Sequence, residues 1–233
     1  MDILRKIERY REEEQKLKWE GTFAEYLELV KAKPWIAQSA HSRVFNMIKD
    51  AGIEEVDGKR NYSFFSSQMF GLEESLERLV EEYFHPAAKR LDVRKRILLL
   101  MGPVSGGKST LVSMLKRGLE QYSHTEKGAI YAIKSCPMHE DPLHLIPIHL
   151  RKDFFEEYGI RVEGNLSPLN MMRLEKEYGN RIEDVMVERI FLSEDKRVGI
   201  GTFSPSDPKS QDIADLTGSI DFSTIAEFGS ESD

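Results

Sequence analysis

Only one cysteine, Cys136, occurs among the 233 residues. A single thiol excludes an intramolecular disulfide framework and is typical of a reducing compartment, so we expect a cytoplasmic protein. Long apolar runs are also missing. The charged stretch from Met1 to Glu20 lacks the apolar centre of a signal peptide, and no later run approaches membrane-spanning length. We therefore expect no membrane partner.

Excess positive charge is a third absence. Lysine and arginine number 33 against 40 aspartate and glutamate residues, which gives a net charge of −7. Such a chain has no global basic field to attract a polyanion, so we expect no nucleic acid partner. Charged residues make up 31% and apolar residues 40%, a balance typical of a globular fold with one principal core.

Apolar residues recur at helical spacing in the first part of the chain. The pattern predicts an exposed amphipathic helix over residues 2–19 and two short helices between 22 and 53, broken at Pro34. Asp57-Gly58 indicates a turn. A stronger helix is predicted from Leu72 to Tyr83, and His85-Pro86 is expected to disrupt it. We assign residues 1–60 to a helical N-terminal region.

A β-loop-α-β unit follows. The wholly apolar run Ile97–Met101 predicts a strand buried on both faces of a parallel sheet. A helix is expected after it over 111–122, and then a second strand over 129–133. Softer patterns predict helices near 169–178 and 182–191 and a strand over 198–203. The fold class expected for residues 61–233 is therefore α/β, with a parallel sheet flanked by helices.

The loop between the first predicted strand and its helix carries the chemistry. Its residues fit the pattern G-x4-G-K-[ST] in the strand-to-helix context that this motif requires. Glycines let the loop wrap closely around phosphate oxygens with its amides pointing inward. The expected nucleotide-binding residues are Gly102, Pro103, Val104, Ser105, Gly106, Gly107, Lys108, Ser109 and Thr110.

The roles within this loop follow from phosphate chemistry. The helix that begins near Lys108 adds its positive dipole end, and Lys108 reaches the β- and γ-phosphates as the catalytic cation. The Ser109 hydroxyl takes a position on Mg²⁺. The expected cofactors are therefore ATP and Mg²⁺. Hydrolysis normally also needs an acidic residue at the end of a neighbouring strand, and Ile190–Asp195 is a weak candidate because the residues before it are spaced as in a helix.

Other constellations stay open or are disfavoured. Phe70-Gly71-Leu72 could line a base pocket or simply pack a helix, and the polar, glycine-containing segment from Gly199 to Gln211 could bind a ligand or form a turn. Asp221-Phe222-Ser223 matches a kinase magnesium tripeptide, but the other motifs of that kinase fold are missing. Four potential zinc ligands lie within fourteen residues, but their spacing and the intervening prolines favour an ordered loop: Cys136, His139, His144 and His149.

Several segments together resemble the PrkA family of bacterial serine protein kinases. They are Phe70–Glu74, the P-loop 102–110, Cys136–His144 and Gly199–Pro208, and residues 22–35 are similar to its N-terminal helical region. The resemblance implies an AAA+-type ATPase core within a longer protein that phosphorylates serine and is linked to stress and sporulation. The family's second acidic motif, its arginine finger and its kinase-like part are expected beyond residue 233, so we expect the domain to be truncated at its C-terminal end.

Three functional hypotheses follow. The first is transfer of the γ-phosphate of ATP to serine in protein substrates, with Lys108 neutralising the charge that develops on the phosphoryl group. The second is an AAA+ motor that serves remodelling or ATP-dependent proteolysis, working as a homo-oligomeric ring. The third is a regulatory module that binds ATP without turnover.

Overall fold

The computed structural model describes residues 3–5, 12, 15–56 and 58–203 of the chain. Residues Met1–Ile200 form one compact unit, and Gly201–Asp233 belong to a second. Among the described residues, the first unit contains the α-helices α2 (Phe23–Ala32), α3 (Ala40–Asp50), α4 (Glu73–Arg78), α5 (His85–Ala88), α6 (Lys108–Ser123), α7 (Arg151–Tyr158) and α8 (Pro168–Tyr178). None of the described helices combines the length and the apolarity that a membrane crossing requires.

In the part of the chain that the structure describes, five strands form two small sheets. The strands are β1 (Glu20–Thr22), β2 (Ile53–Val56), β3 (Lys59–Tyr62), β4 (Ile130–Ile133) and β5 (Met186–Ile190). One sheet has the order β1-β5-β4, and β2 pairs with β3 in a hairpin whose connection contains Gly58 at φ +75°. Short 3₁₀ turns complete the fold: η1 (Pro34–Ala37), η3 (Asp92–Lys95), η4 (Pro142–Leu145), η5 (Ile148–Leu150) and η6 (Ile182–Asp184).

The two helices predicted on either side of Pro34 are confirmed as α2 and α3. Thr22 begins α2 with a capping box, because its hydroxyl accepts from the Glu25 amide at 3.3 Å while Glu25 Oε2 accepts from the Thr22 amide at 2.7 Å. Ser39 caps α3 by accepting from the Ser42 amide. The sequence signals that start these helices are thus local side-chain bonds to amides that the helix itself cannot satisfy.

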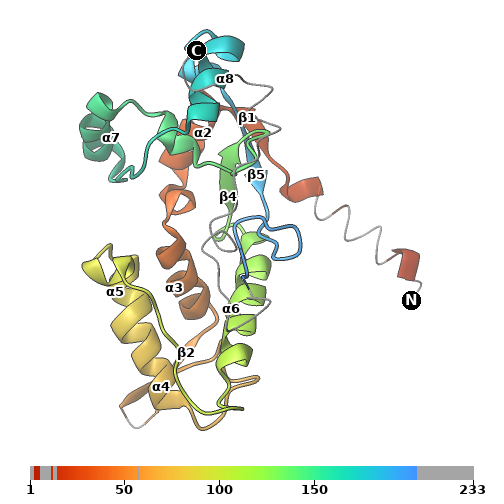
Figure 1. The fold of residues 1–233 in the computed structure, drawn as a ribbon, viewed down its shortest axis with the longest axis vertical. Coiled ribbons are helices and arrows are strands. Elements are labelled where there is room, and N and C mark those ends of the chain that lie inside the picture. The colour runs from red at the N-terminus through yellow and green to blue at the C-terminus, as the bar shows by residue number, and fades with distance from the viewer. Residues whose placement is uncertain (1–2, 6–11, 13–14, 57, 204–233) are drawn as a thin grey trace, which may run out of the picture. The chain divides into compact units, whose positions relative to one another are not determined.

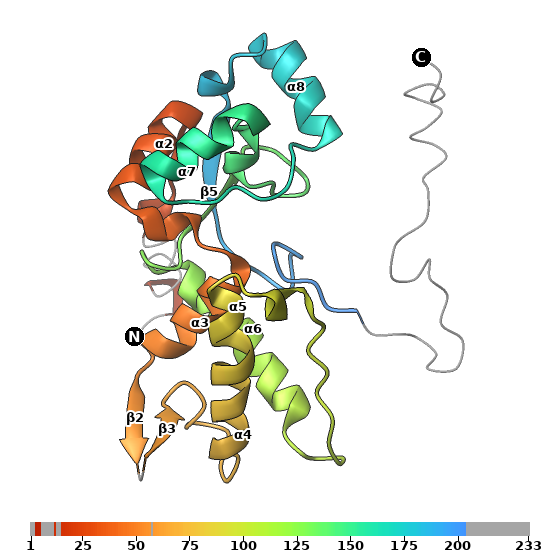
Figure 2. The ribbon, with the colours of Figure 1, turned by 90° about the vertical axis from the view of Figure 1, so that its left-hand side faces the viewer.

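Two apolar clusters make up the core of the described residues. The first gathers α2, β4 and β5 around residues such as Tyr26, Ile133 and Val187. The second joins α3, the helix after Leu72 and α6 around residues such as Ile48 and Val80, and α3 packs against α5 and α6 (Figure 2). Leu111 and Met114 anchor α6 in this second cluster, and α6 in turn positions the P-loop at its N-terminal end.

Buried Arg43 of α3 joins segments that are distant in sequence. Its guanidinium donates to the carbonyls of Ile36 at 3.4 Å, Gln38 at 3.4 Å and Ala129 at 3.2 Å. Burial lowers the pKa of Arg43 to about 10, still well above neutral pH, so the group stays charged in the interior. A buried cation of this kind is tolerated where several acceptors surround it.

The predicted parallel sheet is not confirmed. Both described sheets are antiparallel (Figure 1). The second predicted strand exists as β4, but the prediction of a strand over 97–101 is wrong: this stretch is extended and unpaired, and Ile97 and Met101 are 94% and 82% exposed. A strand needs a hydrogen-bonding neighbour, and none of the described segments pairs with this run. Apolar composition alone could not supply that partner.

Two other local predictions need correction. The helix expected over 182–191 is instead η6 followed by β5, since a short apolar run fits either period. The strand expected over 198–203 is reduced to bridges from Ser193 to Val198 and Gly199. The helix expected from Leu72 to Tyr83 continues through a π-helical turn, η2 (Leu79–Phe84), into α5, so His85-Pro86 disrupts its regular hydrogen-bond pattern, as expected, without ending the helix. Such a turn shifts the hydrogen-bond pattern just before proline, which lacks a donor.

Some predictions stay untested. Most of the helix expected over 2–19 lies outside the described residues, although 3–5, 12 and 15–17 are helical. The tripeptide Asp221-Phe222-Ser223 and the polar segment beyond Phe203 also lie outside them. The helix expected near 169–178 is confirmed as α8, with Ser167 as its cap and Pro168 as its first residue. The division into regions 1–60 and 61–233 remains a prediction, and the β2–β3 hairpin runs across it.

Ile48 and Ile53 allow a matched test of the second apolar cluster. Ile48 is fully buried and Ile53 is 41% exposed. We expect Ile48→Ala to lower the free energy of unfolding by about 2–5 kcal/mol, because it removes buried methylenes and leaves a cavity. Ile53→Ala should change it by less than about 1 kcal/mol. Urea unfolding of the 233-residue chain measures both, and equal losses would contradict the burial pattern.

Candidate functional site

The predicted P-loop forms the turn into α6. The amide of Gly106 donates to the carbonyl of Pro103 at 3.2 Å, which closes the loop. Gly107 then precedes α6 with φ +76°, and no side chain caps this helix end. The first helical bond runs from the Leu111 amide to the Gly107 carbonyl. The amides before it therefore form the positive end of a 16-residue helix.

Glycine is required at the centre of this loop. A Cβ added to Gly107 would lie 3.1 Å from Met69 Cε in a backbone conformation that side chains rarely adopt. A Cβ on Gly106 would lie 3.0 Å from the Pro103 carbonyl oxygen. Ser105 also has positive φ, +66°. The chain is thus bent tightly enough that backbone groups, not side chains, line its inner side.

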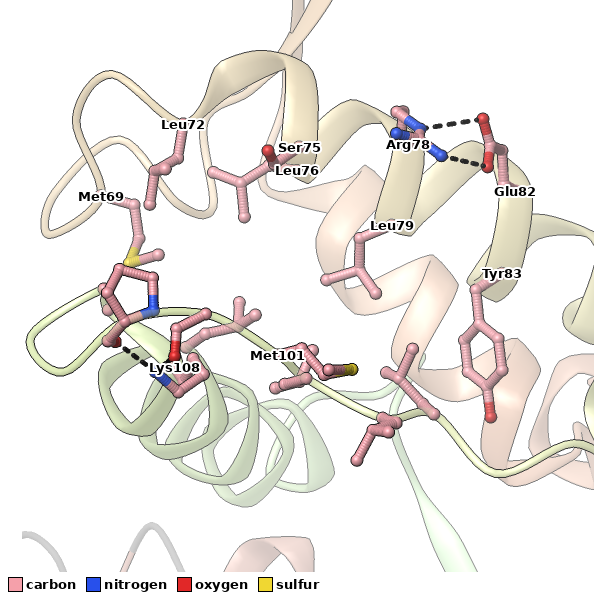
Figure 3. Close-up of a pocket in the computed structure, with 18 residues that line it drawn as sticks. Met69, Leu72, Ser75, Leu76, Arg78, Leu79, Glu82, Tyr83, Met101 and Lys108 are labelled. Carbon is pink, nitrogen blue, oxygen red and sulfur yellow. Dashed lines mark hydrogen bonds and ion pairs between the residues drawn. The ribbon is translucent and has the colours of Figure 1, made fainter.

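Lys108 folds back over the loop. Its Nζ donates to the carbonyl of Gly102 at 2.9 Å and to that of Pro103 at 2.5 Å (Figure 3). Ser109 and Thr110 follow in the first turn and are exposed, as is Val104 at 95%. The structure therefore brings an ammonium group, two accessible hydroxyls and a helix N-terminus together within nine consecutive residues, in the order that the sequence predicted.

A pocket of about 620 Å³ adjoins the loop. One wall is the helix from Leu72 to Tyr83 and the other is the extended segment 98–103, with Lys108 at one end. Figure 3 shows Leu76 and Leu79 pointing toward the segment that carries Met101. Such apolar walls next to a cationic end suit a ligand with a flat ring and an anionic tail.

Of the predicted base-pocket residues, only part lines this cavity. Leu72 does, together with Met69, whereas Phe70 is 76% exposed and is not among the lining residues. Sequence reasoning missed the contribution of Leu76, Leu79 and Tyr83. Their signal was the apolar stripe of the helix itself, which served only to predict that helix.

The weak acidic candidate after β5 lies away from the loop. Glu194 Oε1 accepts from Lys116 Nζ at 2.5 Å, and its amide donates to Glu120 Oε1 at 2.7 Å. Lys116 is eight residues beyond Lys108 on α6, about 12 Å along the helix axis. Glu194 is therefore engaged with the middle of α6 and does not act on the residues of the P-loop in this arrangement.

The Cys/His segment forms an ordered loop, as the sequence favoured. Among the described residues, no group of three or more histidine, cysteine, aspartate and glutamate side chains is arranged to hold a metal ion. The Cys136 thiol is buried and accepts from Asn170 Nδ2 at 3.2 Å. His144 is held between the Glu140 carboxylate, 3.1 Å from Nδ1, and the Glu163 carbonyl, 2.7 Å from Nε2.

Glu140 is the centre of this loop and was missed as such from the sequence. Its Oε1 accepts from the Ser167 amide at 2.8 Å, and its Oε2 accepts from the Ser167 hydroxyl at 2.6 Å and from Asn170 Nδ2 at 2.5 Å. Burial alone would raise the pKa of Glu140, but the hydrogen bonds from Ser167, Asn170 and His144 lower it below its ordinary value. The carboxylate is therefore ionised at neutral pH and anchors the start of α8.

Glu140 should make part of the stability depend on acid pH. A lowered pKa in the folded state contributes stability that is present above the unfolded pKa near 4.5 and is lost as pH falls through the folded value. We expect Glu140→Gln to destabilise the chain at pH 7 by about 1–3 kcal/mol and to flatten the decline below pH 4.5. Urea midpoints from pH 7 to pH 3 test this, with Glu28→Gln as the exposed control on α2. An unchanged acid profile in Glu140→Gln would contradict it.

Comparisons with known proteins complete this picture. The PrkA AAA domain family matches residues 21–233. Over its whole length the chain is 82% identical to the ATP-dependent protease PrkA of Bacillus subtilis, of which it covers 37%. It is 31% identical to the serine/threonine kinase YeaG of Escherichia coli K12 over 169 residues, which are 69% of this chain and 25% of that protein.

The chain thus spans between a quarter and two fifths of the length of these relatives. No solved structure matches it. Both the family match and the 82% identity include the P-loop residues 102–110, whose geometry is described above. An AAA domain implies nucleotide binding, in agreement with the glycine loop, the lysine and the uncapped helix end. The chain belongs to the PrkA AAA domain family.

Proposed function

We propose that the chain binds ATP with Mg²⁺ through Gly102–Thr110. The observation that carries this proposal is the junction at Gly107, where a glycine loop enters an uncapped helix end and Lys108, the first residue of that helix, folds back onto the loop. The donors gathered there are those that polyphosphate oxygens require, because each phosphate oxygen is an acceptor with negative charge. The adjoining pocket offers apolar walls for the purine.

Each residue of the loop has a distinct part in this proposal. The amides of Gly106 to Thr110 bind phosphate oxygens, and the Lys108 ammonium exchanges its two carbonyl partners for the β- and γ-phosphates. The exposed Ser109 hydroxyl fits Mg²⁺, which prefers oxygen ligands and retains several waters. Bound Mg²⁺ would neutralise charge on the β- and γ-phosphates.

We infer further that the bound ATP serves a reaction on proteins. The relative with 82% identity is named an ATP-dependent protease, which supports an AAA+ motor that drives proteolysis. Such a motor would work as a homo-oligomeric ring, in which neighbouring subunits complete each nucleotide site. The more distant relative is named a serine/threonine kinase, which supports transfer of the γ-phosphate to serine in a protein substrate. Lys108 would serve either reaction by neutralising charge on the γ-phosphate.

Lys108→Ala tests the binding proposal directly. Loss of a charge-assisted donor should weaken ATP binding roughly 10- to 100-fold, since hydrogen bonds to charged groups contribute about 1.5–3 kcal/mol. Lys176→Ala on α8 is the matched control, because this substitution also replaces a helical lysine, but one that is exposed and does not line the pocket. Calorimetric titration with Mg-ATP measures both variants. Equal affinities for Lys108→Ala and the native chain would overturn the proposal.

ATP labelled on the γ-phosphate separates the two uses. If the P-loop domain transfers phosphate, label appears on a serine-rich acceptor protein and disappears with Lys108→Ala. If it acts as a motor, label appears as free phosphate and acceptor protein stays unlabelled. The same incubation with the full-length relative from Bacillus subtilis reports fragments of the acceptor if the ATP drives proteolysis. Labelled acceptor with the 233-residue chain would contradict the motor assignment.

A further inference from the structure

One part of the surface is strongly basic although the chain carries a net charge of −7. Residues 89–96 hold five cationic side chains and one carboxylate. This stretch contacts the loop after α7, where Arg90 Nη1 donates to the Arg161 carbonyl at 2.9 Å. Arg151 Nη1 donates to the carbonyl of Gly164 in the same loop at 2.7 Å. We call this surface the basic patch; its cations are Lys89, Arg90, Arg94, Lys95, Arg96, Arg151 and Arg161.

Only two carboxylates belong to the basic patch, so its net charge is +5. Glu163 is shared by two arginines: Arg94 binds it through two nitrogens, at 2.5 and 3.0 Å, and Arg90 lies 3.3 Å from it. Asp92 Oδ1 lies 3.3 Å from Lys95 Nζ in an exposed ion pair, and such pairs contribute little to stability. Half-buried arginines thus fix the frame of the patch, while the side chains of four cations are exposed to solvent: Lys89, Lys95, Arg96 and Arg161.

The pKa shifts of Glu163 and His41, which lie beside the patch, agree with a positive local field. The hydrogen bond from Arg94 lowers the pKa of Glu163, and Arg90 adds to the effect. At the start of α3, burial and the positive charge of Arg94 lower the pKa of His41. The pKa of the carboxylate and that of the imidazole are therefore both lowered, which disfavours the protonated form of each group.

We propose that the basic patch is a docking surface for a short acidic segment of a protein partner. Arginine predominates in it, and the planar guanidinium binds carboxylates through two parallel bonds. Its limited extent decides against an extended polyanion. The rest of the chain has a net charge of −12, and α7 itself carries Asp153, Glu156 and Glu157 after Arg151.

A duplex or an anionic bilayer would extend beyond the patch and meet this acidic surface. A short peptide avoids that repulsion because charges separated by more than about 8 Å are largely screened at physiological salt. None of the exposed patch cations lines the P-loop pocket, so the patch and the nucleotide site use different side chains to bind their ligands.

The test uses a fluorescein-labelled decaglutamate peptide and the 233-residue chain. In the patch variant, Lys89→Glu, Lys95→Glu and Arg96→Glu are combined. In the control variant, Lys31→Glu, Lys49→Glu and Lys176→Glu are combined, so the net charge changes equally at exposed positions outside the basic patch. Circular dichroism and thermal unfolding confirm that both variants are folded. Fluorescence anisotropy at about 50 mM and 300 mM salt gives the affinities.

We expect the patch variant to bind decaglutamate at least tenfold more weakly than the native chain, and the control variant to change by less than threefold. Binding to the native chain should fall as salt rises, and a decaglutamine peptide should not bind. Equal losses in both variants, or no binding of decaglutamate by the native chain, would overturn the proposal. So would tighter binding of a 20-nucleotide single strand or of phosphatidylserine vesicles, which would assign the patch to another class of ligand.

Discussion

The uncapped beginning of α6 is the feature on which the rest of the site depends. A helix starts with amides that have no partner inside it, and here no side chain supplies one. Gly107 turns the chain into this helix with φ +76°, and Lys108 adds a cation at the same point. Donors of hydrogen bonds and positive charge thus accumulate in one small volume. A ligand that satisfies them must be rich in acceptors and negatively charged, which excludes most metabolites other than phosphates and carboxylates.

Two buried charges hold the surrounding segments together. Glu140 connects the loop that follows β4 to the start of α8, and Arg43 connects α3 to η1 and to the residue before β4. Each is tolerated in the interior because it has several hydrogen-bond partners there. These bonds hold segments that the sheet does not join, since a three-stranded antiparallel sheet with a three-residue edge strand links only a few short segments. The segment Cys136–His144 is therefore explained by packing and hydrogen bonding of the loop.

Sequence reasoning succeeded where the signal is local. The helices α2, α3, α6 and α8 follow from apolar spacing, and the P-loop follows from residues adjacent in the chain. It failed where a partner distant in sequence decides. The run Ile97–Met101 has strand composition but no strand beside it among the described residues, and 186–190 fits a helix until β1 and β4 pair with it. Glu140 could not be found from spacing, because its partners Ser167 and Asn170 lie 27 and 30 residues away.

The basic patch and the nucleotide pocket are the two ends of one short stretch of chain. The Tyr83 hydroxyl donates to the Arg96 carbonyl at 3.1 Å, and Tyr83 also lines the pocket. From Arg96 the chain runs through the exposed segment 97–101 directly into Gly102, whose carbonyl accepts from Lys108. This segment has no strand neighbour among the described residues to hold it. An acidic partner on the patch and a phosphate at Lys108 would each bind at one end of this segment. If the partner shifts the segment and thereby changes the affinity for the phosphate, the phosphate must change the affinity for the partner by the same factor.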